Sequence, residues 1–218
     1  MKLVFLGPPG VGKGTYASRL APVLGIPHIS TGDLLREEVK AQTPLGKLIE
    51  ERINKGILMR DEEITEVLKK RLARDDAQKG FILDGYPRTL NQARLLDGLV
   101  EIDLAVLFHL PEDIIIKKLA GRRVCKECGA TYNVVAITGE VHLPALLPEK
   151  EGVCDHCGSP LEEREDDKED VTGKRLAIYR EQTVPVEDYY RKNGQLLEIP
   201  VTGSPDEMLP KIEKLLQQ

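Results

Sequence analysis

The chain has 218 residues, of which 41% are hydrophobic but only 4% aromatic, and its formal net charge is −5. This length suits one core with small insertions. The negative charge argues against non-specific nucleic-acid binding, which needs a basic face, and no apolar run reaches the roughly 18 to 20 residues of a membrane span. We therefore expect no nucleic-acid or membrane partner, and any bound anion must be held by local positive groups.

A short apolar run, Leu3 to Leu6, opens the chain and stops at Gly7-Pro8-Pro9-Gly10. It is too short for the hydrophobic region of a signal peptide, which needs about 7 to 15 apolar residues. We therefore predict a buried strand of a parallel sheet and a cytoplasmic protein.

Helical periodicity and short buried runs alternate along most of the chain, which predicts an α/β fold with a parallel sheet. Asp61 has the residue type of an N-cap for the helix that follows it. Periodicity is lost between residues 121 and 161, which we interpret as an inserted small domain. The expected helices begin near Lys13, Ser30, Leu45, Asp61, Glu112, Val171 and Pro205, and the later strands cover 81–84, 104–110 and 196–201.

A phosphate-binding loop is predicted directly after the first strand, because residues 7–13 fit G-x-x-x-x-G-K and open a helix. Glycines let backbone N–H groups turn toward an anion, and the helix N-terminus adds partial positive charge. Lys13 can then reach the β- and γ-phosphates. Gly14 replaces the usual Ser or Thr, so we expect Mg²⁺ to be held mainly by nucleotide oxygens and water.

Charged and amide side chains near two glycine-containing turns are candidates for binding a second nucleotide. Arg36 and Arg88 can each place a forked guanidinium on a phosphate. Asp84 ends a buried strand, where it can hold magnesium through water or serve as a helix N-cap. Gln92 can read the edge of adenine, because an amide both donates and accepts, or it is a solvated helix residue.

The four cysteines form two pairs, Cys125-x2-Cys128 and Cys154-x2-Cys157, separated by residues 129–153. This spacing predicts a four-thiolate zinc site, which is structural because no coordination position remains open. The metal would replace a hydrophobic core that about 40 residues can hardly supply. His156 is a competing ligand, although the repeated x2 spacing favours Cys157.

Four segments of the chain together resemble the adenylate kinase family, in its form with a long zinc-bearing lid. They are Gly12-Lys13-Gly14-Thr15, 30–36 (STGDLLR), 84–89 (DGYPRT) and Arg175-Leu176. The resemblance implies a P-loop NTPase-type parallel sheet flanked by helices, with a zinc-ribbon-like lid and a helical insertion for the nucleoside monophosphate. The implied core is 1–29, 60–120 and 165–218, with a monophosphate-binding segment at 30–59 and a lid at 121–164.

The resemblance also implies residue roles. The ATP-binding residues would be Gly10, Val11, Gly12, Lys13, Gly14, Thr15, Arg122, Thr131 and Tyr132. The AMP-binding residues would be Thr31, Arg36, Ile57, Leu58, Met59, Gly85, Tyr86, Pro87, Arg88, Gln92, Arg164 and Arg175. The catalytic residues would be Lys13, Asp84, Arg88, Arg122, Arg164 and Arg175. Lys118 departs from the family, since relatives often have an arginine there that stacks on adenine.

The expected reaction is MgATP + AMP ⇌ 2 ADP, in which cations overcome the repulsion between two polyanions. Asp166 and Asp167 are expected to form lid ion pairs, and the acidic run 162–170 is otherwise typical of a solvated face. Other interpretations remain: a kinase for UMP, CMP or GMP, a GTP-using enzyme, a nucleotide sensor, or a zinc-ribbon interaction module. The resemblance favours a monomer.

Overall fold

The computed structural model describes residues 1–54 and 59–217, and the chain divides into two compact units. The first unit contains Met1–Leu6, Ala17–Leu107 and Glu181–Glu198, and the second contains Gly7–Tyr16, Phe108–Arg180 and Ile199–Gln218. Within the described part of the chain, no helix has the length and apolarity needed to cross a bilayer.

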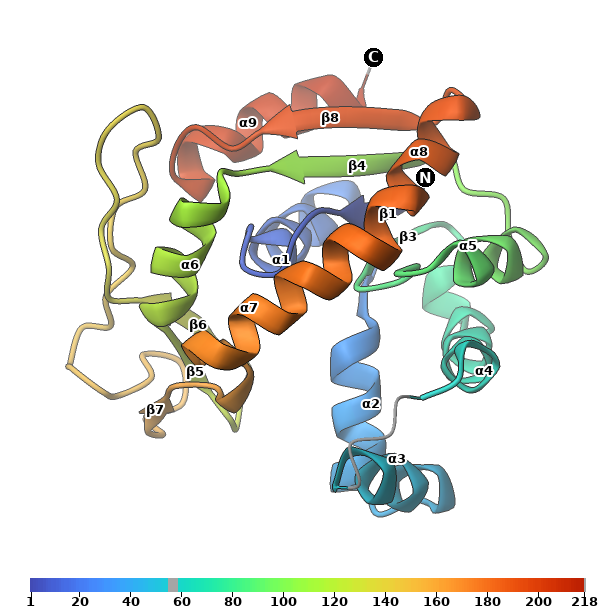
Figure 1. Cartoon of the computed structure of the whole chain (residues 1–218), viewed down its shortest axis with the longest axis horizontal. Helices are drawn as coiled ribbons and strands as arrows, with labels where there is room; N and C mark the ends of the chain where they lie inside the picture. Colours follow the sequence, from blue (N-terminus) through green and yellow to red (C-terminus); the bar gives the residue numbers. More distant parts are fainter. Residues whose placement is uncertain (55–58, 218) are drawn as a thin grey trace. The chain divides into compact units, whose positions relative to one another are not determined.

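A five-stranded sheet in the order β2-β3-β1-β4-β8 forms the centre of the fold (Figure 1). Its strands are β1 Lys2–Leu6, β2 His28–Ser30, β3 Phe81–Asp84, β4 Leu104–His109 and β8 Leu196–Pro200. β1 pairs in parallel with β3 and β4, and β2 pairs in parallel with β3. The continuous apolar run predicted this central position for β1, because such a strand is covered on both faces.

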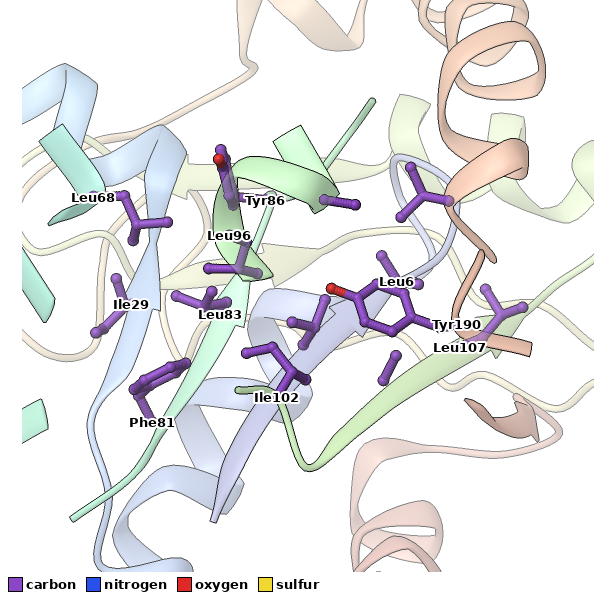
Figure 2. Close-up of a cluster of buried hydrophobic side chains, with 14 of the residues drawn as sticks. Leu6, Ile29, Leu68, Phe81, Leu83, Tyr86, Leu96, Ile102, Leu107 and Tyr190 are labelled. Atoms are coloured by element: carbon purple, nitrogen blue, oxygen red, sulfur yellow. The ribbon is translucent and has the colours of Figure 1, made fainter. Parts of the chain in front are cut away.

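Three helices of the first unit bury a hydrophobic core against this sheet: α4 Asp61–Leu72, α5 Leu90–Asp97 and α8 Val184–Lys192. The unit also contains α2 Thr31–Lys40, α3 Pro44–Asn54, which packs on α2, and most of α1 Lys13–Leu24. In Figure 2, Leu6, Leu83 and Leu107 lie in one cluster with Tyr190. This core fixes the ends of β2 and β3, from which the candidate acceptor residues extend.

The second unit contains α6 Glu112–Ala120, α7 Glu169–Ile178 and α9 Pro205–Leu216. Its inserted segment forms a small antiparallel sheet in the order β6-β5-β7, from β5 Arg122–Cys125, β6 Thr131–Asn133 and β7 Leu161–Glu162. Figure 1 shows these strands next to the ends of α6 and α7. The predicted insertion is therefore confirmed as a separate small sheet.

A hairpin inside this insertion had no signal in the sequence analysis. Ile137 and Leu143 exchange backbone hydrogen bonds, and both side chains are buried. The His142 amide donates to the Thr202 carbonyl at 3.1 Å, in the loop before α9. The insertion therefore has a backbone attachment to the chain before α9, besides its two covalent connections.

The single helix expected to begin near Val171 is two helices, α7 and α8, joined by a π-helical turn at Tyr179–Thr183. Pro185 stands in the first turn of α8. Because proline lacks an N–H and its ring clashes with the preceding turn, regular α-helical bonding cannot continue through it.

Leu83 provides a test of the core, because its side chain is fully buried in the cluster of Figure 2. We expect Leu83→Ala to lower the free energy of unfolding by about 2–5 kcal/mol, from lost transfer energy and the cavity left behind. Urea unfolding measures it. Leu147→Ala is the matched control, since that leucine is 62% exposed; equal losses in the two variants would contradict the assigned core.

Candidate active site

The glycine-rich loop of the second unit adopts a backbone that side chains would obstruct. Gly7 and Gly10 have φ of 133° and 88°, in the left-handed region that favours glycine. A Cβ on Gly7 would lie 2.6 Å from the Phe108 carbonyl oxygen, and one on Gly10 would lie 2.7 Å from the Leu119 side chain. The loop is thus packed against β4 and α6, which holds its shape for an anion.

Lys13 folds back over this loop. Its Nζ donates to the carbonyl oxygens of Gly7 and Pro8 at 2.6 and 3.0 Å. α1 begins at Lys13, so the ammonium group and a helix N-terminus belong to the same loop. This combination is suited to binding a polyphosphate.

Lys118 occupies a second position against the same loop. Its Nζ donates to the Val11 carbonyl oxygen at 2.9 Å. Burial, with the charges of Arg122 and Lys13, lowers the pKa of Lys118 to about 8. The departure from arginine therefore has a structural consequence: this side chain supports the loop backbone in the structure.

Three arginines of the second unit gather around two adjacent aspartates. Arg122 places a two-pronged hydrogen bond on Asp167, with Nε and Nη2 at 2.6 and 2.5 Å from its two carboxylate oxygens. Arg164 makes the same kind of contact with Asp166, at 2.8 Å for each oxygen. Arg175 donates to the Asp166 carbonyl oxygen at 2.7 Å and lies 3.4 Å from Asp167 Oδ1. Three of the residues predicted to bind nucleotide phosphates are thus together.

The aspartates and arginines of this cluster are more buried than expected for ion pairs in the acidic run 162–170. The Asp167 side chain is 0% exposed, so the interpretation of this run as only a solvated face is wrong. Burial lowers the pKa of Arg175, and the neighbouring aspartates oppose that effect. Although burial acts to raise it, the charges of Arg175 and Arg164 hold the pKa of Asp166 below its usual range.

The predicted acceptor residues of the first unit cluster at the ends of β2 and β3. Thr31 Oγ1 donates to the Asp84 carbonyl oxygen at 3.3 Å, and Arg88 Nε donates to the Gly85 carbonyl oxygen at 2.8 Å. The Asp84 carboxylate lies 3.6 Å from His28 Nε2. Thr89, not Asp84, caps α5, because its hydroxyl oxygen accepts a hydrogen bond from the backbone N–H of Gln92. The N-cap alternative for Asp84 is therefore wrong.

Gln92 is 3% exposed, which excludes the solvated alternative. Its Oε1 accepts from the Arg88 amide at 2.8 Å, and its Nε2 donates to Asp61 Oδ1 at 2.7 Å. Asp61 was expected to be an N-cap, but Arg60 has that place and Asp61 is the first residue of α4. Sequence reasoning missed Asp61 because a contact between residues 61 and 92 leaves no local signal.

The remaining acceptor residues have different surroundings. Arg36 forms an exposed ion pair with Asp33 in the first turns of α2. The Tyr86 side chain is buried, with its hydroxyl 2.7 Å from Thr65 Oγ1, and Pro87 is buried as well, so these two can offer a nucleotide mainly backbone. Met59 is partly buried, whereas Ile57 and Leu58 lie outside the described residues.

Thr131 and Tyr132 were expected near the ATP base. Thr131 is exposed, but Tyr132 is buried and its hydroxyl donates toward Cys154 Sγ at 3.8 Å while accepting from the Asp155 amide at 2.9 Å. The Tyr132 side chain therefore supports the cysteine cluster.

The four cysteine sulfurs converge as the spacing predicted, all within 4.8 Å of one another. Cys125 and Cys157 have sulfurs 3.4 Å apart, and Cys128 and Cys154 have sulfurs 3.5 Å apart. Zn–S bonds of about 2.3 Å in a tetrahedron give sulfur–sulfur edges of about 3.8 Å, so the cluster fits zinc. Among the described residues His156 is not part of this group.

Backbone amides favour the thiolate form of Cys154. Although burial acts to raise it, amides of His156 and Cys157 contribute to lowering the pKa of Cys154 to about 6, whereas the neighbouring sulfurs raise the pKa of Cys128. A deprotonated sulfur is the form that binds metal.

The sequence as a whole is similar to known proteins. A family model described as adenylate kinase matches residues 5–195. The chain belongs to the adenylate kinase family. It is 42% identical to the adenylate kinase of Thermosipho melanesiensis, over all of both chains. It is 46% identical to that of Thermotoga maritima, over 98% of this chain and 96% of the relative, and 47% identical to that of Caldicellulosiruptor bescii, over 90% of each.

Membership in the adenylate kinase family makes this protein a phosphotransferase with a nucleotide-binding loop. The phosphate loop, the arginine cluster and the four-cysteine sheet lie in one unit, and the Thr31, Asp84, Arg88 and Gln92 group lies in the other.

Metal removal tests the cysteine cluster. The purified protein should contain about one zinc per chain, and a strong chelator should lower its melting temperature, because metal binding supplies stability that this small sheet lacks. Cys154→Ser should lower both the zinc content and the melting temperature. Thr138→Ala removes an exposed hydroxyl of the same insertion, outside the sulfur group, and serves as the control. Full stability without any bound metal would contradict the assignment.

Proposed function

We propose that this chain catalyses the reversible, magnesium-dependent transfer of a phosphoryl group from ATP to AMP, giving two molecules of ADP. The observation that carries the proposal is the gathering of Arg122, Arg164 and Arg175 in the same unit as the Lys13 loop. Three guanidiniums in the same unit as a phosphate-binding loop can neutralise the phosphates of a donor and of an acceptor. The names of the full-length relatives support the same reaction.

In this proposal the loop and Arg122 bind ATP. Lys13, now bonded to two loop carbonyl oxygens, would exchange them for the β- and γ-phosphates. Gly10, Val11, Gly12, Gly14 and Thr15 would line the same phosphates with their backbone and hydroxyl groups. Thr131 and the backbone of Tyr132 would approach the base or ribose.

AMP would be bound by the residues of the first unit, together with Arg164 and Arg175. Arg36 and Arg88 would hold its phosphate, since guanidinium forks match phosphate oxygens. Thr31, Gly85 and Gln92, with residues 57–59, would surround the base. The attacking atom is an oxygen of the AMP phosphate, which is already anionic, so no side-chain base is needed.

Positive charge would supply most of the catalysis. The two substrates repel each other, and fixed guanidinium and ammonium groups stabilise the charge that is shared between them during transfer. Water must be excluded, otherwise ATP is hydrolysed. Closure of the lid, 121–164, and of the segment 30–59 over a core of 1–29, 60–120 and 165–218 would exclude it.

Two metals have different roles in the proposal. Asp84, a partly buried carboxylate at the end of β3, has the oxygen ligands that Mg²⁺ prefers and would hold it through water. When bound, Mg²⁺ neutralises phosphate charge. Zinc on the four cysteines would stabilise the lid without entering the reaction. We further infer a cytoplasmic monomer that interconverts adenine nucleotides and binds neither nucleic acid nor membrane.

A panel of donors and acceptors tests the function. ADP formation is measured with ATP or GTP against AMP, UMP, CMP and GMP. We expect ATP with AMP to be the fastest pair. Faster turnover with another monophosphate would assign a different kinase, and nucleotide binding without turnover would favour a sensor.

Lys13→Met tests the mechanism. We expect this variant to lose at least about 99% of the activity, because it removes the positive charge that stabilises the transferred phosphoryl group. Its far-UV circular dichroism spectrum should be unchanged. Lys211→Met is the control, since Lys211 is exposed on α9. If Lys13→Met kept more than a few per cent of the activity, this mechanism would be wrong.

A further inference from the structure

The Asp61 carboxylate is a point of convergence for the loop that follows β3. Asp61 Oδ2 accepts from Thr89 Oγ1 at 2.9 Å and from Asn91 Nδ2 at 3.1 Å. Asp61 Oδ1 accepts from Gln92 Nε2 at 2.7 Å. One carboxylate at the start of α4 thus binds three side chains from the start of α5.

These contacts fix which way the Gln92 amide points. An ionised carboxylate can only accept, so the group facing Asp61 must be the amide nitrogen. The Arg88 backbone N–H can only donate, so the group facing it, at 2.8 Å, must be the amide oxygen. Reversing the amide would set oxygen against oxygen and donor against donor. The orientation is therefore decided by the chemistry of both neighbours.

With these two bonds made, and counting partners only among residues 1–54 and 59–217, the amide keeps one acceptor direction on Oε1 and one N–H on Nε2 for a ligand. Adenine offers the complement, because its N6 amino group donates and its N1 accepts. Hypoxanthine and guanine offer the reverse, with O6 accepting and N1–H donating. A Gln92 amide held in the observed orientation matches adenine and mismatches the 6-oxo purines, and only a reversed amide would match them.

We propose that Asp61 is a positioning residue that sets the preference for AMP by holding the Gln92 amide in its adenine-matching orientation. The proposal rests on the proposed function, in which Gln92 meets the acceptor base. Asp61 itself touches no nucleotide in this account; it acts through Gln92. Burial strengthens the effect, because Gln92 is 3% exposed and an unmatched polar group there cannot turn to water for compensation.

The test compares AMP with inosine monophosphate, which has the AMP skeleton with the 6-oxo pattern. For Asp61→Asn we expect the ratio of kcat/KM for AMP to that for inosine monophosphate to fall about tenfold, because a neutral amide at position 61 can face either end of Gln92 and the Arg88 N–H alone then favours the observed orientation. The KM for AMP should rise, while kcat at saturating substrates stays within about twofold. Glu62→Gln is the control: it removes the same charge from an exposed residue of the same helical turn, and it should leave the ratio unchanged.

A double-mutant cycle separates positioning from general damage. In a Gln92→Ala background, adding Asp61→Asn should change the nucleotide preference no further, because there is no amide left to orient. An unchanged AMP preference in Asp61→Asn alone, or an equal effect in the two backgrounds, would overturn the proposal. A wild-type protein that makes no ADP from ATP and AMP would instead refute the proposed function.

Discussion

To bind polyphosphates, this protein must hold several positively charged side chains close together although they repel one another. In the second unit, two carboxylates hold three arginines together. Arg122, Arg164 and Arg175 repel one another, yet all three contact Asp166 or Asp167. Asp167 is 0% exposed, and removing one partner from such a buried group is costly. In the proposed function, the aspartates therefore position the cations before a nucleotide arrives, in a chain whose net charge of −5 supplies no general attraction for anions.

Local features of the fold and site were predictable, because their signals lie within a few residues. The run Leu3–Leu6 identified the central strand, and the G-x-x-x-x-G-K spacing placed Lys13 at the start of α1, as observed. The sequence spacing of the paired cysteines predicted that their sulfurs would form one cluster, and the sulfurs do lie together. The family was likewise recognisable from its short segments, and the comparisons confirm it.

Features that depend on distant contacts were not predictable. Asp61 was predicted to be a helix cap, because its neighbours in the sequence give no sign that Thr89 and Gln92 are its partners. Asp167 looked solvated in its acidic run, because burial depends on how α7 packs. The contact of the Tyr132 hydroxyl with Cys154 also gave no local signal, while the expected place of Tyr132 near the ATP base stays a prediction. The hairpin around Ile137 and Leu143, whose His142 amide donates to Thr202, likewise depends on a contact that is distant in the sequence.

The number of nucleotides bound per chain decides whether the fixed cations hold two phosphate chains, as proposed. Equilibrium titration would use AMP together with an ATP analogue whose β–γ bridging oxygen is replaced by carbon, so that no transfer occurs. The account predicts two nucleotides per chain, one of each kind, with affinities that weaken as salt is added. Binding of a single nucleotide, with AMP and the analogue competing for one place, would contradict it.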